Sequence, residues 1–294
     1  MAIFRWEKLE SPTLEETVHM ATLASGLRVY FCPKPGFRKR YASYATLYGS
    51  VDNDFVEGNG NRVQVPDGIA HFLEHTLFET EKGNVSDLFA RNGAYSNAAT
   101  SFTTTTYLFA ASELFYENLK LLLWFVENPH FRAEKVEKER GIIEEEIRGY
   151  DDSADWVSYR TLLENLFHRH PIRIDIAGTA ETIGRIDVET LERCYRAFYH
   201  PRNMSLFVVG DLDPGELGEF VANHSRGPVE ERSVQARNFP DEPRAVHKPE
   251  AELRMEVALP KLFWGFKEVE VPTTGEEYVR RELVSDMALE LLFG

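Results

Sequence analysis

The chain has 294 residues, of which 43% are hydrophobic, enough to bury one or two hydrophobic cores. Its 48 acidic residues outnumber 33 basic ones, and the formal charge of −15 opposes binding to nucleic acid or to anionic membranes. The sequence has no apolar run of membrane-spanning length, and residues 1–7 lack the apolar stretch of a signal peptide. The two cysteines, Cys32 and Cys194, lie far apart, so we expect a cytoplasmic protein in which both are buried and reduced.

The strongest strand patterns are short runs rich in β-branched and aromatic residues, which favour a pleated, half-buried backbone. We expect these strands at 27–32, 41–48, 103–110 and 204–209. Apolar residues repeat at helical spacing over much of the sequence between them. We expect these helices at 68–80, 84–92, 112–126, 133–149, 156–168, 179–183 and 188–198. Strands first and last, with a helical block between them, predict an α+β fold in which helices cover one face of a largely antiparallel sheet.

A change of composition after residue 227 divides the chain. A linker is predicted at 228–250, where four prolines lie among charged residues: Pro228, Pro240, Pro243 and Pro249. It follows a first unit at 1–227 and precedes a shorter segment at 251–294. In that segment we expect a strand at 253–266 and an amphipathic helix at 278–293. A single strand and a single helix cannot complete a core as large as the first.

The most informative motif lies in the first of the predicted helices. Residues 71–75 read His-Phe-Leu-Glu-His, the H-x-x-E-H order. Side chains three and four residues apart share one helical face, so His71 and His75 can bind one Zn²⁺ while Glu74 reaches a metal-bound water. From the motif alone, a helix with two ordinary, partly buried histidines remains an alternative.

A later helix carries carboxylates that could complete such a site. Glu139 and Glu146 are two turns apart and share a face at 3.6 residues per turn. Ile142 and Ile143 lie between them, so we expect this face to turn inward while Glu144 and Glu145 face solvent. An inward carboxylate is costly unless a cation or hydrogen-bond donors meet it, and a zinc ion on two histidines needs a third protein ligand.

Together these residues resemble the pitrilysin, insulinase and mitochondrial processing peptidase family of zinc metallopeptidases, the inverzincins. In that family the third zinc ligand is a glutamate on a later helix, supported by another glutamate seven residues earlier; Glu146 and Glu139 match these positions. Further segments resemble family landmarks: 26–30, 49–50, 93–98, 199–201 and 208–210. Residues 33–37 and 171–178 are most similar to a bacterial branch, the YmfH-like proteins.

The resemblance implies two similar α+β halves that face one another across a cavity. We therefore expect residues 1–227 to form a complete zinc-binding half and residues 251–294 to begin a second, truncated half. In the family the second half closes the cavity and supplies an Arg and a Tyr near the scissile carbonyl, which no segment here matches. The chain is accordingly expected to be a poor peptidase by itself and to form a homodimer or a heterodimer with a homologous subunit.

The resemblance also implies where a peptide binds. In the family an edge strand accepts the substrate as an additional strand, and residues 93–100 match that strand. Small side chains suit this task, because backbone groups supply the hydrogen bonds and bulk would block the approach. Asn97 and Ala98 are the expected contacts, and Phe78 the expected wall near the cleaved bond. An exposed polar strand without a role in binding is the alternative.

These expectations combine into a zinc metalloendopeptidase that hydrolyses small peptides or unfolded segments held in a cavity. Zinc on His71, His75 and Glu146 would lower the pKa of its bound water and polarise the carbonyl, while Glu74 accepts the water proton and passes it to the leaving amine. Two alternatives stay open: a non-catalytic or assembly subunit that retains zinc for structure, and metal-dependent hydrolysis of something other than a peptide. The intact Glu74 argues against the first of them.

Overall fold

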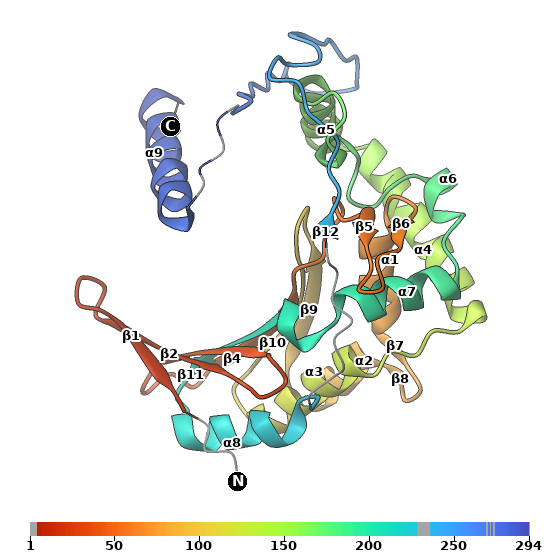
Figure 1. Ribbon diagram of the computed structural model, residues 1–294. Coiled ribbons are helices and arrows are strands. Elements are labelled where there is room, and N and C mark those ends of the chain that lie inside the picture. The colour runs from red at the N-terminus through yellow and green to blue at the C-terminus, as the bar shows by residue number, and fades with distance from the viewer. Residues whose placement is uncertain (1–4, 228–235, 269, 271, 273, 294) are drawn as a thin grey trace.

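A seven-stranded sheet forms the centre of the molecule (Figure 1), here a computed structural model that describes residues 5–227, 236–268, 270, 272 and 274–293. The strands follow the order β1-β2-β3-β11-β4-β10-β9. Their bounds are β1 Glu7–Ser11, β2 Glu16–Thr22, β3 Arg28–Pro33, β4 Arg40–Thr46, β9 Tyr95–Thr100, β10 Thr105–Ala111 and β11 Met204–Gly210. Among the described strands of this sheet, only β11 and β3 pair in parallel, so the predicted largely antiparallel sheet is confirmed.

Helices α3 to α7 lie between β10 and β11, as the sequence predicts, while α1 and α2 precede β9 and α8 and α9 follow β11. Their bounds are α1 Ile69–Leu77, α2 Val85–Arg91, α3 Phe115–Glu127, α4 Ala133–Asp151, α5 Ala154–Leu166, α6 Ala180–Ile183, α7 Val188–Phe198, α8 Pro214–His224 and α9 Gly275–Phe293. Short strands form two smaller sheets: β5 Asp54–Val56, β6 Arg62–Gln64 and β12 Ala236–Arg237 in one, β7 Glu79–Thr80 and β8 Gly83–Asn84 in the other. Single 3-10 turns lie at Pro171–Arg173 and Pro201–Asn203.

One face of the large sheet carries the core. Burial alternates along its strands, so that Tyr107 and Phe109 of β10 are fully buried while their neighbours are only partly covered. Helices α1, α2 and α3 pack against β4, β9 and β10 on the buried face. On the opposite face Phe207 of β11 remains 37% exposed. The α+β prediction with helices on one face is therefore confirmed, and α1 lies directly on the end of the sheet where β9 is the edge.

Several boundaries differ from the predicted ones for local reasons. The helix predicted at 68–80 ends at Leu77, because β7 begins at Glu79 and pairs with β8. Strands β1 and β2 were not predicted, and their sequences are rich in charged and polar residues. Helix α8 was also missed, although Asp213 caps it and Pro214 begins it, both typical start signals.

The strand predicted at 253–266 is wrong. The described residues of that segment form neither strand nor helix, because they have no neighbouring strand to pair with. The segment runs instead beside α5, where a Cβ on Gly265 would meet side-chain atoms of Leu162 and Leu166 at 2.9–3.1 Å. The helix predicted at 278–293 does form, as α9, and stands apart from the large sheet (Figure 1).

The predicted linker is partly anchored to the first unit. Pro228 and the rest of 228–235 lie outside the described residues, while β12 pairs with β5. Glu242 accepts hydrogen bonds from three successive backbone N–H groups at 168–170, each at 2.8 Å, and its carboxylate also contacts Lys267. Among the described residues, no helix combines the length and apolar character needed to cross a bilayer. The division at 1–227, 228–250 and 251–294 stays a prediction.

A buried acid at the end of α3 ties core stability to pH. Glu127 is 8% exposed, and the Tyr44 hydroxyl donates to its Oε1 at 3.0 Å. Burial raises the pKa of Glu127 from 4.5 to about 7, against the opposing effects of Tyr44 and Arg226. The folded protein thus binds this proton more tightly than the unfolded chain, so its stabilisation is complete below pH 4.5 and is lost as the pH rises towards 7.

We expect Glu127→Gln to flatten this pH dependence, because the amide stays neutral and can still accept the Tyr44 hydrogen bond. A shift of this size corresponds to about 3 kcal/mol of unfolding free energy between acid and neutral pH. Thermal unfolding between about pH 5 and pH 8 measures it, with Glu117→Gln on the exposed side of α3 as the control. Equal pH slopes for the parent and both variants would contradict the assignment.

Candidate metal centre

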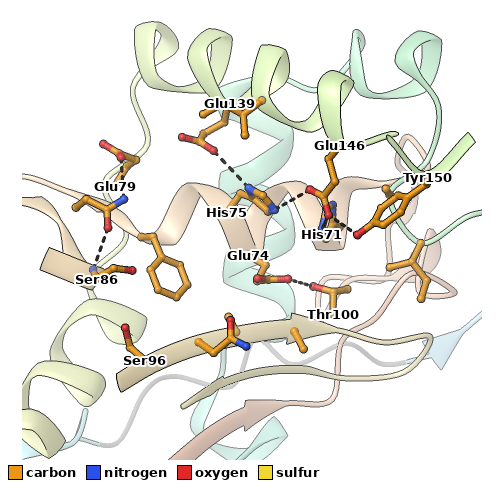
Figure 2. A pocket seen from close by; sticks show the side chains of 18 of the residues that line it. His71, Glu74, His75, Glu79, Ser86, Ser96, Thr100, Glu139, Glu146 and Tyr150 are labelled. Carbon is orange, nitrogen blue, oxygen red and sulfur yellow. Dashed lines mark hydrogen bonds and ion pairs between the residues drawn. The ribbon is translucent and has the colours of Figure 1, made fainter. Parts of the chain in front are cut away.

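Helix α1 carries the histidines and is buried on nearly all sides. It begins after Gly68, whose φ of 89° is left-handed and whose added Cβ would lie 2.4 Å from the carbonyl oxygen of Ala177. This close crossing fixes the start of the helix, and a side chain at Gly68 would displace it. Eight residues of α1 are buried, including His71 and Glu74. Figure 2 shows that His71 and His75 point toward α4, whereas Glu74 points the other way, toward β9.

Helix α4 packs against α1 and presents both predicted carboxylates to the histidines (Figure 2). Glu146 Oε1 lies 3.7 Å from His71 Nε2, and Glu146 Oε2 lies 3.4 Å from His75 Nε2. Glu139 Oε2 lies 3.5 Å from His75 Nδ1, and Glu139 is only 5% exposed. The predicted common face of Glu139 and Glu146 is therefore confirmed by their contacts with the same imidazole.

One detail of the helical phasing is wrong. Ile143 is fully buried, but Ile142 is 44% exposed and lines the cavity in front of the site. The inward direction of α4 therefore lies nearer Ile143 and Glu139 than expected. Glu145 faces solvent as predicted, whereas Glu144 is partly covered. Glu139 is therefore carried on the buried face and Glu146 at its edge, where both can meet α1.

The donor set fits a zinc ion. One ligand atom each from His71, His75 and Glu146 lie within 4.8 Å of one another, and two imidazoles with one carboxylate are typical of a zinc centre with a free fourth position. Burial lowers the pKa of His71 to about 4, with help from the nearby charge of His75. His71 is therefore neutral at pH 7, the form that binds a metal.

The rest of the cluster attracts positive charge. Burial would lower the pKa of His75, but its hydrogen bonds to Glu139 and Glu146 outweigh burial and raise that pKa to about 9. The contact with His75 lowers the pKa of Glu146 to about 2. Without a metal, the His75 imidazolium is thus the cation that compensates two inward carboxylates. A zinc ion would meet the same need and release that proton.

Glu74 occupies a different environment from the other carboxylates. It is 8% exposed, and its Oε2 accepts a hydrogen bond of 2.7 Å from the Thr100 hydroxyl on β9. Burial raises the pKa of Glu74, while the Thr100 hydrogen bond opposes that effect. A carboxylate that binds protons more readily than usual, and whose direction is fixed by a hydroxyl, is suited to general base chemistry.

A cavity of about 590 Å³ opens beside the two helices. Its lining brings together all eight residues predicted for the site: His71, Glu74, His75, Phe78, Asn97, Ala98, Glu139 and Glu146. Phe78 forms part of the wall and packs on Phe125 with ring centroids 5.4 Å apart. Strand β9 pairs only with β10 among the described residues, so its other edge is open, as expected for a strand that binds a peptide.

The cavity lining also includes Tyr150, Trp156 and Asp175, which were not predicted as site residues, and Thr100, which lies in the predicted strand at 93–100 but was given no role of its own. Tyr150 donates a hydrogen bond to Glu146, four residues earlier on α4, and that spacing is a signal the sequence does offer. Burial raises the pKa of Tyr150, so its hydroxyl stays protonated as a donor. Trp156 and Asp175 reach the cavity from α5 and from the loop before α6, which no local pattern indicates.

Comparison with known proteins is consistent with this site. The family model for insulinase, Peptidase family M16, matches residues 59–180, and the model for the Peptidase M16 inactive domain matches residues 185–292. The uncharacterized zinc protease YmfH of Bacillus subtilis is 44% identical over 97% of this chain and 67% of its own. The chain therefore belongs to peptidase family M16, the insulinase and pitrilysin group.

Two solved structures of similar proteins have the same fold. A crystal structure of an M16-like peptidase from Alicyclobacillus acidocaldarius is 39% identical, with a TM-score of 0.77 over 82% of this chain and 56% of that one. The first half of the periplasmic protease PqqL from Escherichia coli is 25% identical, with a TM-score of 0.63 over 76% of this chain and 48% of that one. The chain thus spans between about half and two thirds of the length of these relatives.

The metal centre can be tested ligand by ligand. Ala in place of His71, His75 or Glu146 should abolish stoichiometric zinc, because each removal leaves only two of the three protein donors. Zinc content after gel filtration, measured by atomic emission, reports the result. Glu145→Ala is the matched control, since Glu145 lies next to the ligand on the exposed side of α4. Zinc retained by Glu146→Ala but lost from Glu145→Ala would contradict the assignment.

Proposed function

We propose that this chain is the zinc-binding half of a metallopeptidase that hydrolyses small peptides or unfolded segments. The observation that carries the proposal is the meeting of a His71, His75 and Glu146 donor set with a buried Glu74 in one cavity beside an open strand edge. Relatives named as zinc proteases support the same chemistry. A cytoplasmic location is part of the proposal and rests on composition and on two buried, unpaired cysteines.

Glu74 would act as the general base and then as the general acid. When bound, zinc would activate a water molecule and polarise the scissile carbonyl. Thr100 occupies Glu74 Oε2, which leaves Oε1 to take the proton from the attacking water and to return it to the leaving amine. Glu139, through its contact with His75 Nδ1, would hold that imidazole in the orientation that directs Nε2 toward the metal.

A single peptide-cleavage assay separates the proposed function from two alternatives. A subunit that retains zinc only for structure or assembly is compatible with the match of residues 185–292 to the inactive domain. Metal-dependent hydrolysis of another substrate is the second alternative. Cleavage of a mixed peptide library, followed by mass spectrometry with and without chelator, should yield products only with zinc bound. Glu74→Gln should bind zinc and lose cleavage, because an amide cannot accept the proton.

The open edge of β9 should bind the peptide backbone. Along an antiparallel edge strand, the N–H groups of successive residues point alternately to the neighbouring strand and to the open side. Of Asn97 and Ala98, paired with Leu108 and Tyr107, one N–H therefore faces the substrate and the other faces β10. We expect proline at the outward position, which we assign to Ala98, to raise KM at least tenfold with zinc intact.

Proline at the neighbouring Asn97 is the matched control. It should remove a hydrogen bond to β10 and lower the melting temperature instead of acting on KM alone. If the two effects are exchanged, only the register assignment is wrong. Unchanged KM for both variants would contradict peptide binding at this edge.

An exposed apolar face on α9 favours association with another chain. Val279, Leu283 and Met287 are 52–64% exposed, and Leu291 is 84% exposed. We propose that a second copy or a homologous subunit covers this face. Light scattering should give a mass above that of the monomer, and Leu283→Glu should reduce it, while Glu282→Gln should not.

The proposed association with a second subunit also concerns the rate of peptide hydrolysis. The family resemblance implies an Arg and a Tyr from a second half near the scissile carbonyl, and loss of one such donor commonly costs ~10²–10³ in rate. We expect slow turnover for this chain compared with a longer relative that carries both halves. A monomeric chain with the turnover of that relative would contradict both expectations.

A further inference from the structure

We propose that Tyr150 is a positioning residue that fixes the carboxylate of Glu146 for zinc, and that Trp156 and Asp175 hold Tyr150 in place. The inference rests on the zinc site proposed above. It concerns three residues outside the donor set and outside the H-x-x-E-H motif, which reach the cavity from α4, from α5 and from the loop before α6. Figure 2 shows the Tyr150 ring beside Glu146, on the side away from Glu139.

Glu146 is the ligand that most needs such support. Its side chain is 28% exposed, compared with 11% for His71. The surface of α4 beside it is open, since the side chains of Glu145 and Arg148 are 73% and 63% exposed. A glutamate has three rotatable side-chain bonds, so a partly exposed one loses considerable rotamer freedom on binding a metal. A donor that already holds the carboxylate removes part of that cost.

Tyr150 supplies this donor one helical turn after Glu146. Its hydroxyl donates to Glu146 Oε1, the oxygen that lies 3.7 Å from His71 Nε2, while Oε2 lies 3.4 Å from His75 Nε2. The hydrogen bond therefore sets which carboxylate oxygen faces which histidine. Tyr150 acts on the metal through Glu146, just as Glu139 acts through His75.

Tyr150 is itself held by an aromatic and polar contact chain. Its ring stacks on Trp156 of α5, with centroids 4.9 Å apart and planes 26° apart. Trp156 Nε1 donates to Asp175 Oδ2 at 2.8 Å, and the Asp175 side chain is only 9% exposed. Asp175 Oδ1 in turn accepts the backbone N–H of Ala177 at 3.0 Å. Each group in the chain has a partner on either side, so the phenol cannot swing freely.

This series of contacts ends at the start of α1, the helix that carries His71 and His75. Gly178 has a φ of +74°, and a Cβ there would lie 2.6 Å from the carbonyl oxygen of Asp67. From the other side of this contact, a Cβ on Gly68 would lie 2.4 Å from the Ala177 carbonyl oxygen. The loop that holds Trp156 is thus pressed onto the residues that begin α1. The contacts form a closed circuit from α1 through the loop, α5 and Tyr150 to Glu146 and back to His71.

The decisive measurement is the zinc dissociation constant of the 294-residue chain, obtained by competition with a chelator of known affinity. Tyr150→Phe removes the hydroxyl and keeps the stacked ring, and we expect it to weaken zinc binding ~10–100-fold, the range for groups that orient a ligand. Tyr116→Phe is the matched control. The Tyr116 hydroxyl is buried between α3 and α8 with no hydrogen-bond partner among the described residues, so its loss should leave zinc affinity unchanged.

Asp175→Asn tests the rest of the circuit. Its effect should be smaller than that of Tyr150→Phe, and the double variant should bind zinc about as weakly as Tyr150→Phe alone, because both act through one hydroxyl. Additive losses would overturn the circuit. A role in general stability predicts a lower melting temperature of the zinc-free chain with parental zinc affinity, and that result would overturn the proposal.

Failure of this inference can be told from failure of the zinc site. If His71→Ala abolishes zinc binding while Tyr150→Phe binds within twofold of the parent, the site stands and the positioning role is overturned. If the parent binds no zinc, or binds it independently of His71, both are overturned. Loss of affinity in Tyr150→Phe with an unchanged far-ultraviolet spectrum and melting temperature would support both.

Discussion

The structure depends on the charge balance between α1 and α4. Three carboxylates, Glu74, Glu139 and Glu146, and two imidazoles, His71 and His75, share a partly buried space, and burial of an unpaired charge costs several kcal/mol. The contacts of His75 with Glu139 and Glu146 meet part of this cost. Glu74 is separated from that cluster by its direction toward Thr100. One helix thereby presents two kinds of group, the histidines of the candidate metal centre on one side and a carboxylate suited to accept a proton on the other.

The large sheet supplies the support that this arrangement requires. Because α1 is covered by the sheet below and by α4 above, its side chains cannot reorient to escape an unfavourable charge. Phe78 at its C-terminal end packs on Tyr107 and Phe125, deep in the aromatic core. The same sheet leaves β9 unpaired on one side, next to the cavity. Edge strands in proteins are usually protected, and this open edge, made mostly of small residues, is the basis of the peptide-binding role proposed for β9.

The parts of the fold that the sequence predicts are those set by short-range patterns. The i, i+4 spacing of His71 and His75 and the two-turn spacing of Glu139 and Glu146 place donors on helix faces without knowledge of the tertiary structure. Strands with buried β-branched and aromatic residues, such as β3 and β11, are predicted for the same reason. The polar strands β1 and β2 lack that signal because one lies at the sheet edge and has little to bury.

The remaining parts depend on contacts between distant residues. Residues 253–266 have strand composition, yet a strand needs a partner, and the described residues offer none there. Trp156 and Asp175 are 19 residues apart, and they meet at the site only because the loop crosses the start of α1 at Gly68 and Gly178. The exposure of Ile142 depends on which face of α4 packs against α1, and periodicity alone does not specify that face.

Helix α5 connects this long-range packing to the metal centre. No residue of α5 is fully buried, so its place is set by contacts on each side and not by a core of its own. On one side it meets α4 and carries Trp156, and on the other it meets the segment at 246–266, with Lys261 pairing Asp155 at 2.6 Å. Just past the C-terminal end of α5, the Glu242 carboxylate accepts hydrogen bonds from the backbone N–H groups of residues 168–170. Residues that follow the predicted first unit therefore stabilise α5, the helix against which Tyr150 stacks. On the positioning role proposed for Tyr150, the order of Glu146 would depend in this way on residues about 100 positions later in the sequence.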